Sequence, residues 1–208
     1  DKIIKFYLLK NKTGKLITNI KNGILGFQHL CDSIENTHHY PVSRIIMILS
    51  EFEREFRNIY GRDYDRSDDY LLVKNDVLSL IDSYLKNTSG KRRQYAKQFR
   101  KYVNNRDSSF EATLKTALYD CKEVMEPFLI KRYEGTYETI SFDLSSRMGE
   151  IRNGIAHSRL DLRFDAIHLS DIKIVEELLY AMRLKKMKLK THDIQKAIND
   201  LFSEHMAI

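Results

Sequence analysis

From Pro41 onward, apolar residues recur at the spacing of a helix. Between positions 45 and 59 they fall three or four residues apart, so one face of the predicted helix is apolar. Ser43 is the predicted N-cap, because its hydroxyl can accept a hydrogen bond from an amide of the first turn. Gly61 is the predicted end. The residues expected to face the core are Ile45, Ile48, Leu49, Phe52, Phe56 and Ile59.

The same spacing predicts three more helices before residue 135. The first begins at Asp68 or Asp69 and ends near Gly90, the second covers about 91–103, and the third covers about 109–133. Pro127 lies inside the third helix and is expected to kink it or end it early, because proline has no backbone N–H to donate. The apolar face expected for the first of these helices consists of Val73, Val77, Leu78, Ile81 and Leu85.

Three further helices are predicted over about 137–158, 170–187 and 192–206, with Ser170 and Thr191 as N-caps of the last two. The chain has only two prolines and eight glycines in 208 residues, which leaves little room for a loop-rich or all-β fold. The sequence therefore predicts an all-α helical bundle.

Residues 1–40 differ from the rest of the chain. The run from Ile3 to Leu9 predicts a β-strand, and the segment from Asn11 to Gly14 predicts a turn. We therefore expect a short, partly β appendage over residues 1–40, or the tail of an upstream domain, followed by a helical domain over 41–208. Because the chain starts at Asp1 and not at Met, a fragment of a longer protein is expected.

The formal net charge of +6 is compatible with a polyanionic partner, and equally with a surface that serves solubility. Cys31 and Cys121 are far apart and have no metal-like spacing, so both are expected to be free thiols in a reducing compartment. The longest aliphatic run, from Ile45 to Leu49, is too short to cross a bilayer, and no signal peptide is apparent. A cytoplasmic location with no membrane contact is expected.

Candidate chemistry gathers on the helix predicted over 137–158. Its apolar stripe consists of Ile140, Leu144, Met148, Ile151 and Ile155. At about 100° per residue, the side opposite this stripe presents a polar stripe, with Arg152 on its flank. The residues of the polar stripe are Ser146, Glu150, Asn153 and His157. An imidazole and a guanidinium together offer a proton shuttle near neutral pH and a fixed positive charge.

Arg152 and His157 lie about 140° apart on an ideal helix, so one copy does not make a close Arg–His pair. Gly154 could loosen the helix locally. Alternatively, two copies of this face could meet across a twofold axis, so that residues of both chains line one cleft. A polar face flanked by apolar residues favours the second option, a homodimer.

The Arg–His spacing alone has little specificity, because about one or two chance matches are expected in a chain of this composition. Arg163 and His168 have the same separation, but they lie between two predicted helices, and Phe164 follows the arginine. Asn153 follows Arg152 on a strongly amphipathic helix. The context therefore favours the first pair as the functional one.

Arg152, Asn153 and His157 on a late helix resemble the signature of the HEPN superfamily (higher eukaryotes and prokaryotes nucleotide-binding domains). The segment from Val175 to Met187 looks like the helix that follows the motif in ApeA-like HEPN proteins of bacterial anti-phage defence. The resemblance covers about 41–208 and is sharpest over 140–190. It implies a HEPN-like helical bundle that acts as a dimer.

The resemblance implies a metal-independent endoribonuclease, without cofactor, whose substrate ribose supplies the attacking 2′-OH. The products would be a 2′,3′-cyclic phosphate and a 5′-OH. His157 would be the general acid or base, Arg152 would stabilise the phosphorane, and Asn153 would orient the phosphate or the histidine. The implied context is a bacterial toxin or anti-phage effector, with tRNA among the possible targets and an upstream sensor domain or regulatory partner. The alternative is a non-catalytic HEPN module that dimerises or binds RNA or nucleotide.

Weaker supporting residues are Glu150 and Ser146 of the polar stripe, and Glu53, which either approaches the site or pairs with arginines of its own helix. The segment from Lys91 to Tyr102 alternates cations with aromatics; packing of the aromatics in the core is favoured over RNA binding. The stronger candidates for contacts to RNA phosphates, which a solvated helix end also explains in part, are Arg183, Lys185, Lys186, Lys188 and Lys190.

Overall fold

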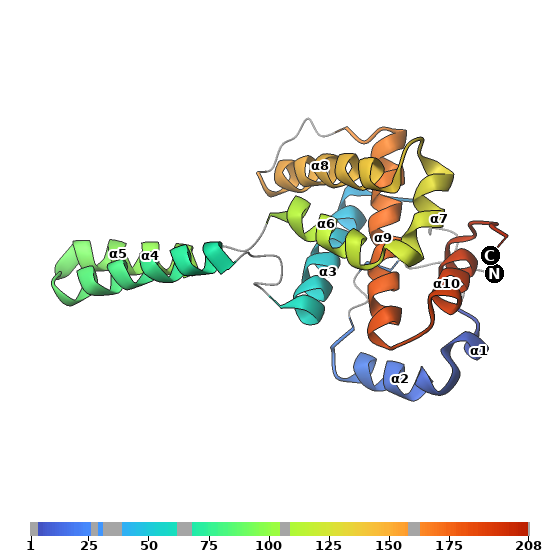
Figure 1. The fold of residues 1–208 in the computed structure, drawn as a ribbon, viewed down its shortest axis with the longest axis horizontal. Helices are drawn as coiled ribbons and strands as arrows, with labels where there is room; N and C mark the ends of the chain where they lie inside the picture. Colours follow the sequence, from blue (N-terminus) through green and yellow to red (C-terminus); the bar gives the residue numbers. More distant parts are fainter. Residues whose placement is uncertain are drawn as a thin grey trace. The chain divides into compact units, whose positions relative to one another are not determined.

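The computed structural model describes residues 4–25, 29–30, 39–61, 68–104, 109–157 and 163–207. These residues are helical or irregular, with no β-strand among them, which confirms the all-α fold (Figure 1). The helices are α1 (Phe6–Leu9), α2 (Thr13–Lys21), α3 (Val42–Tyr60), α4 (Asp68–Lys86), α5 (Gly90–Asn104), α6 (Phe110–Asp120), α7 (Lys122–Arg132), α8 (Tyr137–Ala156), α9 (Ala166–Lys186) and α10 (Thr191–Phe202). No described helix has the length and apolar character needed to cross a membrane.

The chain divides into two compact units. Residues 1–61 and 109–208 form the first, and residues 62–108, which contain α4 and α5, form the second. Leu8 and Leu9 belong to the same buried core as α3 and α9. The sequence-based division into residues 1–40 and 41–208 stays a prediction. The division seen in the structure is a different one, because it separates residues 62–108 from the rest of the chain.

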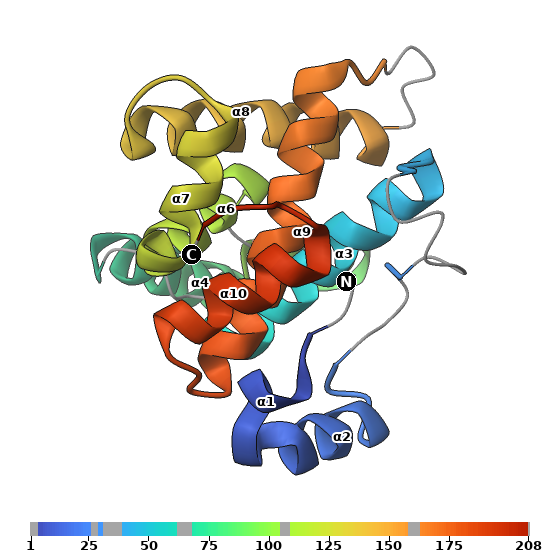
Figure 2. The same ribbon diagram turned by 90° about the vertical axis from the view of Figure 1, so that its right-hand side faces the viewer.

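Helix α9 lies at the centre of the first unit. It is buried on nearly its whole circumference, from Ile172 to Leu184, as expected for a helix that other elements surround. Helices α3, α7, α8 and α10 pack against it. In Figures 1 and 2, α8 crosses the end of α9 that is farthest from α2. The central helix therefore sets the position of the helix that bears the candidate motif.

The apolar face of α3 is buried as predicted: Ile45, Ile48, Leu49, Phe52 and Phe56 lie in the core, and Ile59 packs at its edge. The start of α3 was predicted two residues too late. Pro41, not Ser43, is the N-cap, with extended backbone angles that proline readily adopts. Gly61 ends the helix with φ 82°, a left-handed conformation that glycine tolerates best.

The helix predicted over about 109–133 is broken at Cys121, six residues before Pro127. Ser109 caps α6 as its position suggests, with its hydroxyl accepting from Ala112 N at 3.1 Å. Pro127 is inside α7 and cannot donate to the carbonyl of Glu123, four residues earlier. The side-chain Nε2 of Gln195, on α10, donates to that carbonyl instead at 2.9 Å. A tertiary contact therefore permits the proline within the helix.

Two predicted N-caps of the last helices were wrong. Helix α9 begins at Ala166, because Asp165 forms a capping box in which its carboxylate accepts from His168 N at 3.0 Å. Ser170 is inside this helix and bonds back to the carbonyl of Ala166. Helix α10 has Lys190 as its N-cap, and Thr191 is its first residue.

The predicted N-terminal strand is also wrong over the described residues 4–9. Residues 6–9 form α1, a short 3-10 helix follows over Lys10–Lys12, and α2 begins at Thr13 within the predicted turn. Leu8 and Leu9 are both buried, although neighbouring residues of a strand point to opposite faces. A helical turn lets both leucines face the same core. Ile3 lies outside the described residues.

The predicted apolar face of α4 does not form a buried core. No residue of α4 is buried, and Val73 is 61% exposed. Within its unit, α4 packs on α5 across a short connection over residues 87–89. A two-helix unit covers only the facing sides of its helices, so part of each apolar stripe stays in solvent.

Candidate functional site

The candidate motif lies on α8, whose start is fixed by its own side chains. Thr136 is the N-cap, and its hydroxyl accepts from Thr139 N at 3.3 Å. The apolar stripe is buried as predicted: Ile140, Leu144, Met148 and Ile151 are in the core, while Ile155 packs at its edge. The stripe opposite therefore faces away from the core.

The predicted polar stripe is at the surface. Glu150, Asn153 and His157 are exposed, and Ser146 is half-buried. His157 is the C-cap of α8, and its backbone N–H donates to Asn153 O at 3.0 Å. Within the described part of the chain, no hydrogen bond or ion pair occupies the imidazole of His157 or the amide of Asn153. Both groups are therefore accessible to a ligand.

Arg152 is held by Glu53 of α3. Its Nε lies 3.1 Å from Glu53 Oε1, and its Nη2 lies 3.4 Å from Oε2, so the two planar groups meet edge to edge. Both side chains are partly exposed, 32% for Arg152 and 20% for Glu53. The structure thus brings together two of the predicted site residues. It does not bring Arg152 and His157 into contact within one chain, as the 140° separation on the helix requires.

A second arginine holds the opposite flank of α8. Arg147 Nε lies 2.7 Å from Oδ2 of Asp171 on α9, and its Nη2 lies 2.9 Å from Oδ1. Asp171 is fully buried and also accepts from the Tyr133 hydroxyl at 2.7 Å. Burial, and then the Asp171 carboxylate, raise the pKa of Tyr133, so this hydroxyl remains a donor at neutral pH. No spacing motif in the sequence links Arg147, Asp171 and Tyr133, so this cluster was not among the predicted site residues.

The two arginines lie on either side of the buried stripe of α8, and each pairs with a different helix. Arg152 reaches α3 and Arg147 reaches α9, so α8 cannot rotate about its axis without breaking one pair. Gly149 adds a third constraint, because a Cβ there would lie 3.2 Å from the Cβ of Glu111 on α6. These contacts fix the direction in which Asn153 and His157 project.

The second Arg–His pair of the sequence has a structural role for its histidine. The backbone N–H of Asp165 donates to His168 Nδ1 at 3.4 Å, which closes the capping box at the start of α9. Arg163 is exposed in the preceding segment. The two histidines with the same spacing from an arginine therefore differ. The side chain of His157 is exposed at the end of α8, whereas that of His168 is part of the N-terminal cap of α9.

The predicted phosphate-binding cations lie around the C-terminal end of α9 and do not share one environment. Arg183 is buried, with Nη2 2.9 Å from Glu51 Oε1 and Nε 3.4 Å from Glu55 Oε2. Lys185 pairs with Asp120 at 2.8 Å, and Lys186 donates to Asn58 O at 3.1 Å. Lys188 and Lys190 are exposed.

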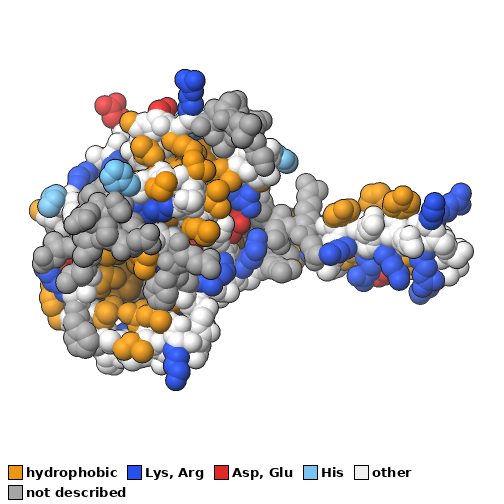
Figure 3. Space-filling model, turned by 180° about the vertical axis from the view of Figure 1, so that it is seen from behind, with side chains coloured by type: hydrophobic (Ala, Val, Ile, Leu, Met, Phe, Trp, Pro, Cys, Tyr) orange, Lys and Arg blue, Asp and Glu red, His pale blue; other side chains and the backbone are white. Residues whose placement is uncertain are grey.

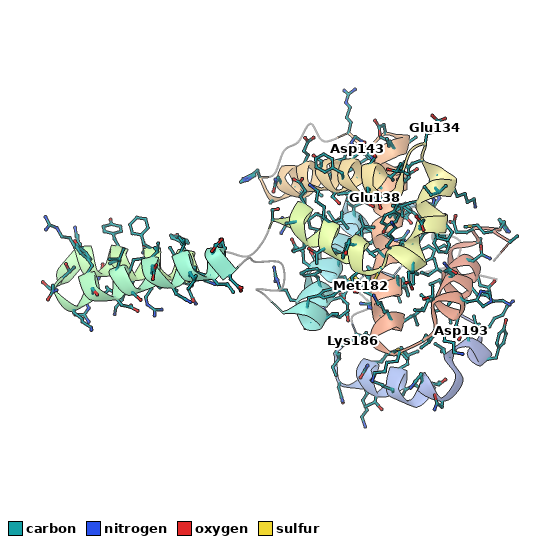
Figure 4. All side chains as sticks on the ribbon, in the orientation of Figure 1. Glu134, Glu138, Asp143, Met182, Lys186 and Asp193 are labelled. Atoms are coloured by element: carbon teal, nitrogen blue, oxygen red, sulfur yellow. The ribbon has the colours of Figure 1, made fainter. Side chains whose placement is uncertain are left out.

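These cations are also far along α9 from the crossing with α8. Asp171, which binds α8, and Lys186 are separated by fifteen residues of one helix, or about 22 Å. Figure 4 shows the same relation, with Lys186 at one end of the helical unit and Glu138 and Asp143 of α8 at the other. One chain therefore does not place the basic run beside His157.

Among the described residues, no group of three His, Cys, Asp or Glu side chains is arranged to hold a metal ion. Cys121 is a free, buried thiol, and burial raises its pKa to about 12. Cys31 lies outside the described residues.

Known proteins offer no comparison for this geometry: no protein-family model, no curated protein and no solved structure matches the chain.

Proposed function

We propose that the chain is a metal-independent endoribonuclease of the HEPN type. The observation that supports this most directly is the exposed end of α8, where the unoccupied imidazole of His157 and the amide of Asn153 lie one turn apart. Arg152, on the flank of the same turn, supplies the positive charge that a phosphorane requires. Cofactor-free cleavage of RNA needs a group that transfers protons and a fixed positive charge near the phosphate, and these residues offer both.

In the proposed reaction the ribose 2′-oxygen attacks the adjacent phosphorus, and the bond from phosphorus to the 5′-oxygen breaks. A base removes the 2′-OH proton, and an acid gives a proton to the departing 5′-oxygen. His157 takes one or both of these roles, because an imidazole changes its charge near neutral pH. Arg152 stabilises the negative charge on the non-bridging oxygens, and Asn153 orients the phosphate. The products are a 2′,3′-cyclic phosphate and a 5′-OH.

The proposed site is completed by a second copy of the chain. Arg152 projects toward α3 and His157 away from it, so a phosphate at one imidazole is not contacted by the arginine of the same helix. Two α8 faces related by a twofold axis would set the arginine of one copy beside the histidine of the other. Ser146 and Glu150, on the same exposed stripe, would then line the cleft.

The test uses the purified full chain with total RNA and with a tRNA pool in the presence of EDTA. We expect cleavage that His157→Ala and Arg152→Ala each reduce by at least about 100-fold, the usual range for loss of a general acid or base. His192→Ala is the matched control, since it removes another exposed histidine. The fragments should accept phosphate from polynucleotide kinase without prior phosphatase treatment, which reports a free 5′-OH. Cleavage that persists in His157→Ala contradicts the proposal.

The alternative is a non-catalytic HEPN module that dimerises or binds RNA or nucleotide. One observation favours it: the charge of Arg152 is already compensated by Glu53 at 3.1 Å. In that case the wild-type chain binds RNA, or dimerises, without producing fragments. Binding that Arg152→Ala weakens, with no cleavage of any RNA offered, would favour this alternative.

The proposed cellular role is that of an effector in a bacterial toxin or anti-phage system, held inactive by a sensor domain or a regulatory partner. A ribonuclease without metal or cofactor needs such control, because its substrate is always present. Expression of the isolated chain should then slow growth, and His157→Ala should relieve the effect.

A further inference from the structure

The unit formed by α4 and α5 is a helical hairpin with almost no core of its own. Among its described residues, 68–104, Ala96 is the only buried one. The facing sides of the helices are half-buried, and Arg100 on α5 pairs with Asp82 on α4 at 2.6 Å. Two helices of this length bury too little apolar surface to be stable as an isolated pair.

Large apolar side chains remain exposed on both helices. Val73, Leu80 and Tyr84 of α4 are 61%, 71% and 49% exposed, and they follow each other at helical spacings of seven and four residues. On α5, three aromatic residues at spacings of four and three are 60–69% exposed. These are Tyr95, Phe99 and Tyr102. The expectation that these aromatics pack in a core is therefore wrong for the hairpin itself.

The two stripes lie on the same side of the hairpin. On each helix, the stripe lies about 100° around the helix axis from the side that faces the other helix. Viewed from the N-terminus of each helix, the direction of this rotation is the same for α4 and α5. In an antiparallel pair this rotation turns both stripes toward one side. We define these six residues as the apolar face of the hairpin.

The cations of α5 lie on the other side. Arg93, Lys97 and Lys101 follow each other at intervals of four residues, about 180° from the aromatic stripe. Figure 3 shows hydrophobic side chains along one edge of the hairpin and Lys and Arg side chains along the other. The alternation of cations and aromatics in the sequence thus becomes a separation in space. A surface that stacks bases while it holds phosphates needs both kinds of side chain together, so this separation argues against an RNA platform.

We propose that the apolar face of the hairpin docks on the same face of a second copy of this chain, forming an antiparallel four-helix bundle. A face with the same composition in both copies suits an isologous interface. Four aromatic and two aliphatic side chains at these exposures offer on the order of 600 Å² per copy, close to the roughly 800 Å² per partner of a stable interface. The proposal does not depend on the ribonuclease.

The charges of the two helices select one arrangement. Helix α4 has four aspartates and two lysines, a net charge of −2, whereas α5 has six cations and no acidic residue, a net charge of +6. Placing α4 of one copy over α5 of the other therefore pairs opposite charges and makes every neighbouring pair antiparallel. The basic sides of the two hairpins then point outward, about 20 Å apart, beyond the Debye length of about 8 Å at physiological salt.

The proposal is tested by sedimentation of the full chain over a range of concentrations. We expect a dimer with a dissociation constant of roughly 10 µM or tighter. Phe99→Lys and Leu80→Lys should each raise that constant by at least about 100-fold, because a twofold interface contains each residue twice. Gln94→Lys is the matched control, since it adds the same charge to α5 about 110° from the aromatic stripe, on the side of the helix turned away from α4. Circular dichroism establishes that each variant keeps its helix content.

A photo-reactive benzoylphenylalanine at position 99 identifies the occupant of the face. A mixture of isotope-labelled and unlabelled chains should give a covalent dimer whose cross-link joins position 99 to α4 of the other copy. Cross-links confined to one chain would show that the face docks within the same molecule and would overturn the proposal. A wild-type chain that stays monomeric at about 100 µM, or variants that dimerise as the wild type does, would also overturn it.

Discussion

Arg152 Nε lies 3.1 Å from Glu53 Oε1, although the two residues are separated by 99 positions in the sequence. The pair joins the middle of α3 to the last turn of α8, where the candidate residues Asn153 and His157 also lie. The pair therefore fixes the direction of the Arg152 side chain beside the candidate site. The carboxylate of Glu53 also offsets the positive charge that Arg152 brings to the site.

Glu53→Gln tests whether this pair serves the site. The pair is partly exposed, so its loss should lower the free energy of unfolding by no more than about 1 kcal/mol. If Arg152 acts on the phosphorane, we expect kcat for RNA cleavage to fall by about 10-fold with little change in KM, because a freely rotating guanidinium is no longer oriented.

The control for this prediction is Glu134→Gln, which removes an exposed carboxylate from the segment before α8 (Figure 4). Arg152→Lys keeps the charge but loses the two-point contact with Glu53, and should behave as Glu53→Gln does. Equal cleavage in the wild type, Glu53→Gln and Arg152→Lys would mean that the pair only joins α3 to α8.

The apolar stripes of α3 and α8 could be predicted from sequence because each depends only on local spacing. They determine which side of each helix is buried, and so they correctly turn Asn153 and His157 outward. The contact between Arg152 and Glu53 could not be predicted in this way. It depends on how two helices cross, which is set by α9 packing against both.

The errors in helix ends have a common physical origin. Ser43 and Ser170 have suitable side chains for a cap, but Pro41 and Asp165 precede them and start the helices earlier. The break at Cys121 has no clear local signal. The carbonyl of Glu123, to which Pro127 cannot donate, accepts instead from the side chain of Gln195 on α10. Local rules cannot anticipate a hydrogen bond between residues 72 positions apart.

That hydrogen bond leads to a double-mutant prediction. Gln195→Ala leaves the carbonyl of Glu123 without a donor from α10, and should cost about 1 kcal/mol of unfolding free energy. Pro127→Ala restores a backbone N–H to the same carbonyl. In the Pro127→Ala background, Gln195→Ala should therefore cost markedly less.

Chemical denaturation of the four proteins measures this coupling. We expect an interaction energy of at least about 0.5 kcal/mol between positions 127 and 195. Gln94→Ala, an exposed glutamine in the hairpin, is the control for loss of a glutamine side chain. Additive effects at 127 and 195 would show that the two residues do not share the carbonyl.

The close approach of α6 and α8 gives a prediction at Gly149. Alanine normally stabilises a helix interior by up to about 1 kcal/mol relative to glycine. At Gly149 the added Cβ would lie 3.2 Å from the Cβ of Glu111, closer than carbon atoms pack without strain. We expect Gly149→Ala to give no gain in melting temperature. Gly149→Leu should lower it by several degrees and weaken any RNA cleavage, because α8 must move away from α6. Unchanged stability in Gly149→Leu would contradict this packing.

The last prediction concerns the acid stability of the first unit. His29 is fully buried, with its Nε2 3.4 Å from the Tyr180 hydroxyl. Burial, followed by the positive charges of Arg183, Arg44 and Arg54, lowers the pKa of His29 from 6.5 to about 3. Because the folded-state pKa lies below the unfolded one, the unfolded chain binds a proton between pH 6.5 and pH 3 that the folded chain does not.

The free energy of unfolding should therefore fall as the pH drops through this window. His29 should account for a loss on the order of 4 kcal/mol by pH 3. His29→Gln removes the titration and retains a side chain that can bond to Tyr180. At pH 7.5 the variant should have a lower free energy of unfolding than the wild type. Urea denaturation at each pH should show this difference shrinking steadily on acidification. His192→Gln, which removes an exposed histidine, should follow the wild type throughout. Parallel curves for the wild type and His29→Gln would mean that His29 is protonated as readily in the folded chain as in the unfolded one.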